Sequence, residues 1–294
     1  MSRLADALAQ ADRERSVTEQ VVESFAAGED PRFRLVMESL VRHLHGFIRD
    51  VRLTQAEWDA SIAFLTRVGD ITDERRQEFI LLSDVLGASM MTVGVNSPAR
   101  TEATESTVFG PFFVADAPAF EHGDDLSQGL SGRPCHVHGS VTSATGTPLL
   151  GARVEVWAAD DEGFYDVQIE GTEFAGRGHL ATDSNGEFSF WTVQPAPYPI
   201  PHDGPVGDLL TLAGRSPMRP AHIHFMVTAD GHEKLITHVF VAGDPWLESD
   251  AVFGVKESLI LDFVEREPTS HGPHGRALEE PWSEVRFDIV LAEE

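Results

Sequence analysis

The aromatic residues of this chain are unevenly chosen: 18 phenylalanines accompany only two tyrosines, Tyr165 and Tyr198. Phe serves wherever a plain ring is enough, so the two phenol oxygens are candidates for chemistry. Tyr165 follows a strand-like run that ends near Ala159, and Tyr198 lies among four prolines between Pro195 and Pro201. Proline fixes φ, which predicts a stiff extended loop around Tyr198. The alternative is that each phenol only satisfies its own burial with a hydrogen bond.

Histidine supplies a second set of candidates in the form of three His-x-His pairs. These are His43 with His45, His136 with His138, and His222 with His224. The first pair lies in a helical segment, where side chains two positions apart diverge by about 200° and cannot share one ion. The other two pairs lie on strand-like runs, where alternate side chains share a face. We interpret the second pair as satisfied strand histidines and the third as candidate metal ligands.

A site built from Tyr165, Tyr198, His222 and His224 would offer two phenolates and two imidazoles. A free phenol has a pKa of about 10, so it ligates at neutral pH only beside a strongly electron-withdrawing ion. That requirement favours ferric iron over Ca²⁺, Mg²⁺ or zinc. Ferrous oxygen-activating sites use two histidines and one carboxylate instead.

The elements that must position these residues fall into two halves with different periods. From Ser16 to about Gly94 apolar residues recur at helical spacing, and Ser16 with Glu19 and Thr54 with Glu57 have the spacing of capping boxes at helix starts. The two apolar stripes comprise Phe33, Met37, Leu40, Leu44, Phe47 and Val51, and then Trp58, Ile62, Leu65 and Val68.

From His136 onward the period drops to two, which is typical of strands. The strand-like runs are 152–157, 188–193, 221–228, 235–242 and 285–289. Gly- and Pro-rich turns between short strands predict a β-sandwich. The expected fold class is α+β: a helical N-terminal domain at 1–95, a connecting segment with a functional loop at 96–130, and a β-sandwich catalytic domain at 131–294.

Charge and cysteine content exclude several classes of function. The net charge of −26 argues against binding nucleic acid or anionic membranes. A single cysteine, Cys135, rules out an internal disulfide and fits a reducing cytoplasm. The N-terminal residues show no signal peptide, and no apolar run reaches membrane-spanning length, so we expect a cytoplasmic protein.

Taken together, the motifs resemble those of the intradiol ring-cleaving dioxygenases, in particular the catechol and hydroxyquinol branch. The resemblance covers nearly the whole chain and is carried by Arg-Pro-Ala-His-Ile-His-Phe at 219–225, Pro-Tyr-Pro-Ile-Pro at 197–201, and the tyrosine at 165. It implies one Fe(III) per subunit, held by Tyr165, Tyr198, His222 and His224. Substrates would be a small aromatic diol or triol and O₂.

The same resemblance implies roles for other residues. Tyr198 would leave the metal when the diol binds and help take up a proton, and Arg219 would stabilise negative charge that develops on the ring; a surface ion pair is the alternative for Arg219. The implied substrate-binding residues are Leu81, Asp84, Val108, Phe109, Gly110, Ile200, Pro201, His238 and Val252.

Two of these positions bear on which substrate is used. His238 stands where most catechol-cleaving relatives have glutamine and hydroxyquinol enzymes are expected to have histidine, although a plain strand histidine is nearly as good an interpretation. Asp84 is the only charged residue between Phe79 and Met91. It could accept a hydrogen bond from the third hydroxyl of hydroxyquinol, or it could lie exposed on the wet side of its helix.

The resemblance also implies a homodimer formed by the helical half, with a phospholipid or fatty acid bound at its interface. The expected activity is intradiol cleavage of hydroxyquinol to 3-hydroxy-cis,cis-muconate or maleylacetate in aromatic catabolism. The alternatives are a catechol or chlorocatechol 1,2-dioxygenase, and a β-sandwich binding module without redox chemistry.

Overall fold

The computed structural model describes residues 2–73, 76–97, 102–169 and 174–294. The chain forms two compact units, Met1–Thr66 and Arg67–Glu294. The predicted connecting segment at 96–130 lies within the second unit, and its residues 98–101 lie outside the described part. Residues 102–133 contain neither a helix nor a named strand.

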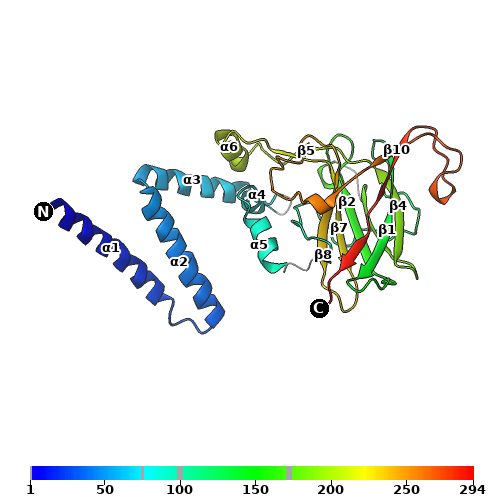
Figure 1. Ribbon diagram of the computed structural model, residues 1–294. Helices are drawn as coiled ribbons and strands as arrows, with labels where there is room; N and C mark the ends of the chain where they lie inside the picture. Colours follow the sequence, from blue (N-terminus) through cyan, green and yellow to red (C-terminus); the bar gives the residue numbers. More distant parts are fainter. Residues whose placement is uncertain (1, 74–75, 98–101, 170–173) are drawn as a thin grey trace. The chain divides into compact units, whose positions relative to one another are not determined.

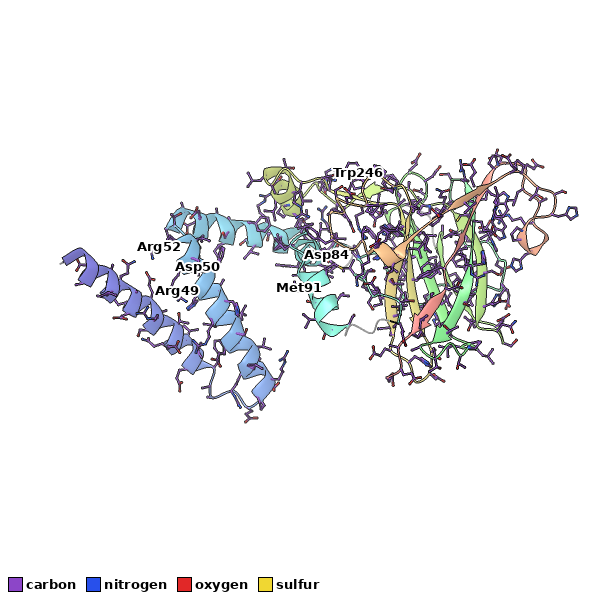
Figure 2. All side chains as sticks on the ribbon, in the orientation of Figure 1. Arg49, Asp50, Arg52, Asp84, Met91 and Trp246 are labelled. Atoms are coloured by element: carbon purple, nitrogen blue, oxygen red, sulfur yellow. The ribbon has the colours of Figure 1, made fainter. Side chains whose placement is uncertain are left out.

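The first unit is helical (Figure 1) and contains α1 (Ser2–Ser24), α2 (Pro31–Val51) and the start of α3 (Gln55–Ile71). Asp30 caps α2 by accepting a hydrogen bond from the Arg32 amide at 2.8 Å. Arg42 joins α2 to α1 through two bonds to the Glu19 carboxylate, at 2.7 and 3.0 Å. Arg49, labelled in Figure 2, adds a bond to Thr18 Oγ1 at 2.8 Å.

One predicted helix start is confirmed and the other is wrong. Thr54 and Glu57 form a reciprocal capping box at the start of α3, with separations of 2.8 and 3.3 Å. Ser16 instead lies inside α1, where its hydroxyl accepts a bond from Gln20 and Glu19 is used by Arg42. Ser16 and Glu19 therefore have the spacing of a capping box, but they make side-chain hydrogen bonds within α1 and between α1 and α2 instead.

The second unit adds α4 (Glu78–Val85), α5 (Ala88–Asn96) and α6 (Pro205–Leu212) to the strands. Among the described residues no single helix is both long and apolar enough to cross a membrane. The α4–α5 pair meets that length and composition test only when taken together, across a 75° bend.

Two five-stranded sheets form the body of the second unit, with the strand orders β10-β11-β1-β12 (β4 also pairs with β1) and β3-β2-β7-β8-β9. Figure 1 shows β1 and β4 in one layer and β7 and β8 in the other. The strands are β1 (Pro134–Ser143), β2 (Arg153–Ala158), β3 (Arg177–Ala181), β4 (Glu187–Val193), β7 (His222–Thr228), β8 (Leu235–Val241), β9 (Ile260–Leu261), β10 (Val264–Arg266), β11 (Trp282–Arg286) and β12 (Ile289–Leu291).

The predicted β-sandwich is thus confirmed, and its core contains side chains from both sheets. Phe188 of β4 packs on Phe225 of β7 with ring centroids 6.2 Å apart. Ile223 and Phe225 belong to this core. Because side chains alternate along a strand, His222 and His224 of β7 lie on the opposite, outer face of their sheet.

The strand predictions hold with one local difference. The run at 285–289 was read as one strand, but it divides into β11 and β12, both parallel to β1. Between them the Phe287 amide donates a hydrogen bond to the His138 carbonyl, and the Asp288 carboxylate accepts hydrogen bonds from Ser140. The two residues between β11 and β12 are therefore still hydrogen-bonded to β1.

Candidate active site

The candidate site lies on the outer face of the β7–β8 sheet, where three short elements bring their side chains to the strand histidines. Tyr165 immediately precedes the 3₁₀ turn η1 (Asp166–Gln168). The proline-rich segment forms the two-residue strand β5 (Tyr198–Pro199), which pairs with β6 (Met218–Arg219) so that Tyr198 lies opposite Arg219.

Four donor atoms form a closed ring at this place. Tyr165 and Tyr198 have their phenol oxygens 3.2 Å apart, and His222 and His224 have their Nε2 atoms 3.1 Å apart. The ring is completed by 3.0 Å between His224 Nε2 and Tyr165 and by 3.5 Å between Tyr198 and His222 Nε2. Protein nitrogen and oxygen ligands lie about 2.0–2.2 Å from a first-row metal ion, so donors about 3–3.5 Å apart suit one ion among them.

The tautomer of His222 suits this use. Its Nδ1–H donates to the Pro220 carbonyl at 2.7 Å, which leaves Nε2 as the atom with a free lone pair. Burial, with a smaller effect of the Arg219 charge, lowers the pKa of His222 to about 3. The pKa of His224 also lies well below its usual range, again chiefly because of burial. Both imidazoles are therefore neutral at physiological pH, as metal ligands must be.

The phenols are shifted in the opposite sense. Burial, strengthened by the neighbouring Tyr198, holds the pKa of Tyr165 well above its usual value. Burial also raises the pKa of Tyr198, although the Arg219 charge opposes it. The protein alone thus keeps both phenols protonated, so a cation that converts both to phenolates must be strongly polarising. The donor set fits ferric iron by this chemistry.

Glycine allows two of these groups to approach. Gly163 has φ +87°, and a Cβ there would lie 2.5 Å from Tyr198 Cβ. Gly110 has φ +77°, and a Cβ there would lie 3.0 Å from the His224 ring. Both positions need a left-handed backbone and close contact, which only glycine meets without strain.

Comparison with known proteins agrees with this geometry. A family described as Dioxygenase matches residues 108–293, and one described as Catechol dioxygenase N terminus matches residues 30–104. Hydroxyquinol 1,2-dioxygenase of Nocardioides simplex is 56% identical over 95% of this chain and 96% of its own length. The protein of that name from Rhodococcus opacus is 57% identical, covering 96% and 94%.

The chain belongs to the intradiol ring-cleavage dioxygenase family. Its fold matches the crystal structure of hydroxyquinol 1,2-dioxygenase from Pseudomonas putida DLL-E4 with a TM-score of 0.89 and 42% identity, over 97% of this chain and all of that one. Catechol 1,2-dioxygenase from Acinetobacter radioresistens gives a TM-score of 0.83 at 27% identity, covering 96% and 93%. The chain is an enzyme of this family, and the interpretation as a non-enzymatic binding module is wrong.

In this dioxygenase Arg219 is buried beside the ring of donors rather than paired at the surface. Its Nη1 lies 3.1 Å from His222 Nε2. Its Nε donates to Asp250 at 3.0 Å, and Asp250 also accepts the Gly254 amide at 2.8 Å. Burial pulls the pKa of Asp250 upward, but the charge and hydrogen bonds of Arg219, together with the His222 charge and the Gly254 amide, lower it overall. The guanidinium is therefore fixed by a carboxylate that stays ionised.

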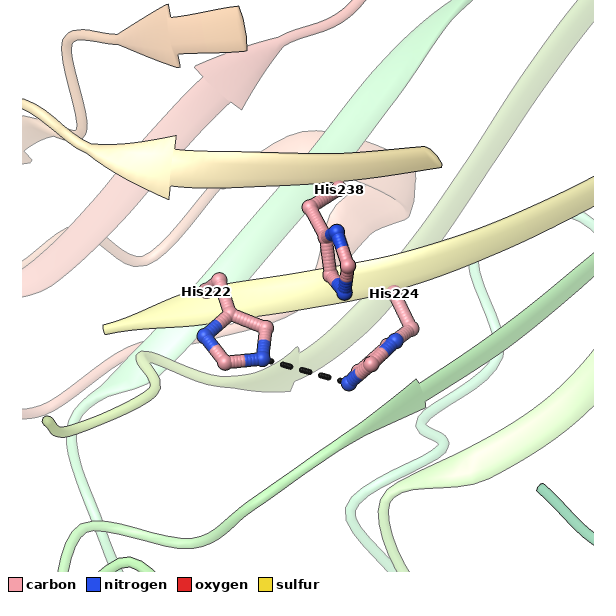
Figure 3. Close-up of side chains that lie close together, drawn as sticks. All are labelled: His222, His224 and His238. Carbon is pink, nitrogen blue, oxygen red and sulfur yellow. Dashed lines mark hydrogen bonds between the residues drawn. The ribbon is translucent and has the colours of Figure 1, made fainter. Parts of the chain in front are cut away.

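His238 lies on β8 directly across from His224, and the two rings are 4.1 Å apart. Figure 3 shows its ring above the gap between His222 and His224. Metal-ligating atoms of the three histidines lie within 4.8 Å of one another. His238 Nδ1 is engaged by the Thr107 hydroxyl, whereas its Nε2 is buried without a partner. His238 thus presents a free nitrogen to the site, unlike a satisfied strand histidine.

The predicted substrate-binding residues divide into two groups. Leu81, Val108, Ile200 and Val252 are buried in one apolar cluster. Phe109 instead packs against the rings of Phe113 and Trp157 and is 39% exposed. Pro201 is half-buried.

Asp84 is buried near the end of α4 (Figure 2), so the interpretation as an exposed surface residue is wrong. Burial raises the pKa of Asp84, and this rise is opposed by a hydrogen bond from Ser89 and the charge of Arg219.

Several groups that complete the site were not anticipated from sequence. Trp157 stacks on His224 with ring centroids 4.7 Å apart. Arg177 forms a buried ion pair with Asp166, next to Tyr165. One signal was present: Trp157 falls among the outward positions of a period-two strand, and a large ring there marks a covered outer face.

Proposed function

We propose that this enzyme is a hydroxyquinol 1,2-dioxygenase that adds both atoms of O₂ to benzene-1,2,4-triol and opens the ring between its adjacent hydroxyl-bearing carbons. The product is 3-hydroxy-cis,cis-muconate, which is isomeric with maleylacetate. The observation that carries this proposal is the closed ring of two phenol oxygens and two imidazole nitrogens, in a chain 55–57% identical to three proteins of that name.

The cofactor in this proposal is one Fe(III) per subunit, held by Tyr165, Tyr198, His222 and His224. When bound, it would act as a Lewis acid and as a template for the two adjacent hydroxyl groups. Tyr198 would accept a proton from the diol, because burial raises the pKa of its phenol and favours the protonated form, although the Arg219 charge opposes this. Arg219, locked by Asp250, stabilises negative charge on the ring oxygen.

We assign the apolar cluster of Leu81, Val108, Ile200 and Val252 to the aromatic ring, together with Gly110, Pro201 and the edge of Phe109. We assign Asp84 and His238 to the third ring hydroxyl, because both are buried, Asp84 shares α4 with Leu81 of this cluster, and His238 lies next to His224. A third ring hydroxyl needs such a partner, whereas catechol has no group to offer it. This asymmetry favours hydroxyquinol over catechol or chlorocatechol as substrate.

We further propose a homodimer in the cytoplasm that buries the apolar residues of the helical unit around a phospholipid or fatty acid. Leu40, Leu44 and Phe47 of α2 are each more than half exposed in the single chain. An exposed apolar stripe on a chain of net charge −26 requires cover. Organic extraction of the pure protein should release the lipid; extraction that yields none removes this part of the proposal.

The decisive experiment is a visible absorption spectrum of the purified protein, followed by anaerobic addition of hydroxyquinol and catechol in parallel. A broad charge-transfer band that shifts on adding diol is expected, with faster aerobic turnover of hydroxyquinol. Preference for catechol would leave the family intact but refute the substrate. Absence of the band after iron reconstitution would refute the four-ligand site.

A further inference from the structure

A second cluster of metal-ligating side chains lies in the other sheet, on β1 and β11. His136 and His138 are alternate residues of β1, and Glu284 of β11 lies directly opposite His136 in the parallel register. The Glu284 Oε1 atom is 3.5 Å from His136 Nδ1 and 3.6 Å from His138 Nε2. One nitrogen or oxygen from each of the three residues lies within 4.8 Å of the others.

His136 contradicts its interpretation as a satisfied strand histidine. Its side chain is 6% exposed; Nδ1 has only the Glu284 carboxylate at 3.5 Å, and Nε2 has no hydrogen-bond partner. Its ring contacts are with aromatic groups: the His138 ring at 5.2 Å and the Trp191 ring at 4.9 Å. A buried ring nitrogen without a hydrogen-bond partner is unfavourable, which calls for an explanation at this position.

The carboxylate is oriented toward the histidines from behind. Arg266 of β10 donates from Nε at 3.0 Å and from Nη2 at 2.8 Å, both to Glu284 Oε2. The other oxygen, Oε1, is left to face both imidazoles. Hydrogen bonds of this kind, made to the far atom of a ligand, orient the ligands of metal sites.

We propose that His136, His138 and Glu284 bind a divalent first-row cation of the Zn²⁺ type, at a site separate from the Tyr165–Tyr198–His222–His224 centre. Two imidazoles and a carboxylate are ligands that Zn²⁺ accepts, and ligand distances of about 2.0–2.2 Å match the separations of 3.5–3.6 Å after small side-chain rotations. His138 and Glu284 are partly exposed, which leaves a coordination position open to water.

The test uses the iron-loaded protein, so that the first centre is filled. Equilibrium dialysis against Zn²⁺ with elemental analysis should find one zinc per subunit in addition to iron. His138→Gln and Glu284→Gln should each weaken zinc binding at least tenfold, with iron content and the visible band unchanged. His43→Gln is the matched control, because it removes an exposed histidine of another His-x-His pair and should bind zinc like the wild type.

A readout without variants comes from thermal melting of the wild-type iron protein, where Zn²⁺ should raise Tm and a chelator should reverse the rise. The proposal is overturned if both variants bind zinc as tightly as the wild type. It is equally overturned if zinc uptake occurs only as iron is lost, or if no zinc binds at about 0.1 mM, where a micromolar site would be filled.

Discussion

At the residue scale, several buried histidine nitrogens without hydrogen-bond partners lie in or beside the two clusters of donor atoms. His224 Nδ1 and His238 Nε2 are buried without hydrogen-bond partners, as are both nitrogens of His136. Most buried polar groups in proteins are hydrogen-bonded, so such exceptions are informative. His238 Nε2 and the His136 nitrogens lie where other donor atoms converge, so they are available to a ligand at those places.

Asp84 gives the sharpest test of substrate choice. Helix α4 has two buried carboxyl groups, Glu78 and Asp84. Glu78 already accepts hydrogen bonds from Arg76 and the Val206 amide, so Asp84→Ala removes the carboxyl group that we expect to bind a third ring hydroxyl. A hydrogen bond to a charged group contributes about 1.5–3 kcal/mol, so kcat/KM for hydroxyquinol should fall about 10–100-fold more than for catechol. The exposed Asp208→Asn serves as the control, and equal losses on both substrates would remove the selectivity role.

Asp84 should also lower the free energy of unfolding at neutral and alkaline pH. Because the pKa of Asp84 is raised in the folded protein, the unfolded state releases this proton first as pH rises. Stability is therefore lost as pH rises through the folded pKa, by about 1.4 kcal/mol for each unit of elevation. Asp84→Asn should raise Tm relative to the wild type at pH 8 and do so less at pH 4.5. A Tm difference independent of pH would contradict a buried, raised carboxyl group.

The ligand candidates were accessible from sequence because they are rare residues in distinctive spacing. Two tyrosines among many phenylalanines, and a His-x-His pair on a strand, are visible without a structure. The role of Asp250 could not be predicted from sequence, because its hydrogen bond with Arg219 joins residues 31 positions apart, and Asp250 lies in a loop without periodicity. Sequence patterns predict local elements well and the contacts between loops poorly.

At the element scale, short segments bring the candidate ligands together. β5 consists of only two residues, yet its pairing with β6 sets Tyr198 opposite Arg219. The strand periodicity predicted β2, β4, β7 and β8 closely, because alternation is a local property. It did not predict the break between β11 and β12, which depends on bonds from Phe287 and Asp288 to β1.

The turn at Gly163 offers a test of this positioning. Gly163→Ala would put a methyl group 2.5 Å from Tyr198 Cβ, so Tyr198 must move and both the charge-transfer band and turnover should fall, the latter about 100-fold for a displacement of about 1 Å. Gly146→Ala is the matched control, since Gly146 has a similar φ of +81° with nothing within 4 Å. A band unchanged in Gly163→Ala would show that Tyr198 is not held by this contact.

At the scale of the whole molecule, the two units differ in how completely they bury their apolar residues. The second unit has a core shared by both sheets, whereas α2 in the first unit has a single buried residue, Val41. The apolar stripe predicted from the sequence lies on α2, where Leu40, Leu44 and Phe47 are exposed. Sequence could not say what covers this stripe, because period and spacing describe a helix face and not the surface that packs against it.

Dimer formation through α2 predicts the effect of one substitution in this stripe. Leu44→Glu would place a charge in an apolar interface and add to the acidic repulsion between subunits, so light scattering after size exclusion should find a monomer where the wild type is a dimer. Leu212→Glu is the control, since Leu212 is an equally apolar and more exposed residue of α6, and it should remain dimeric. Because the donor ring lies wholly in the second unit, the Leu44→Glu monomer should keep its iron and its visible band. A monomeric wild type, or a Leu44→Glu dimer as tight as the wild type, would place the subunit interface elsewhere.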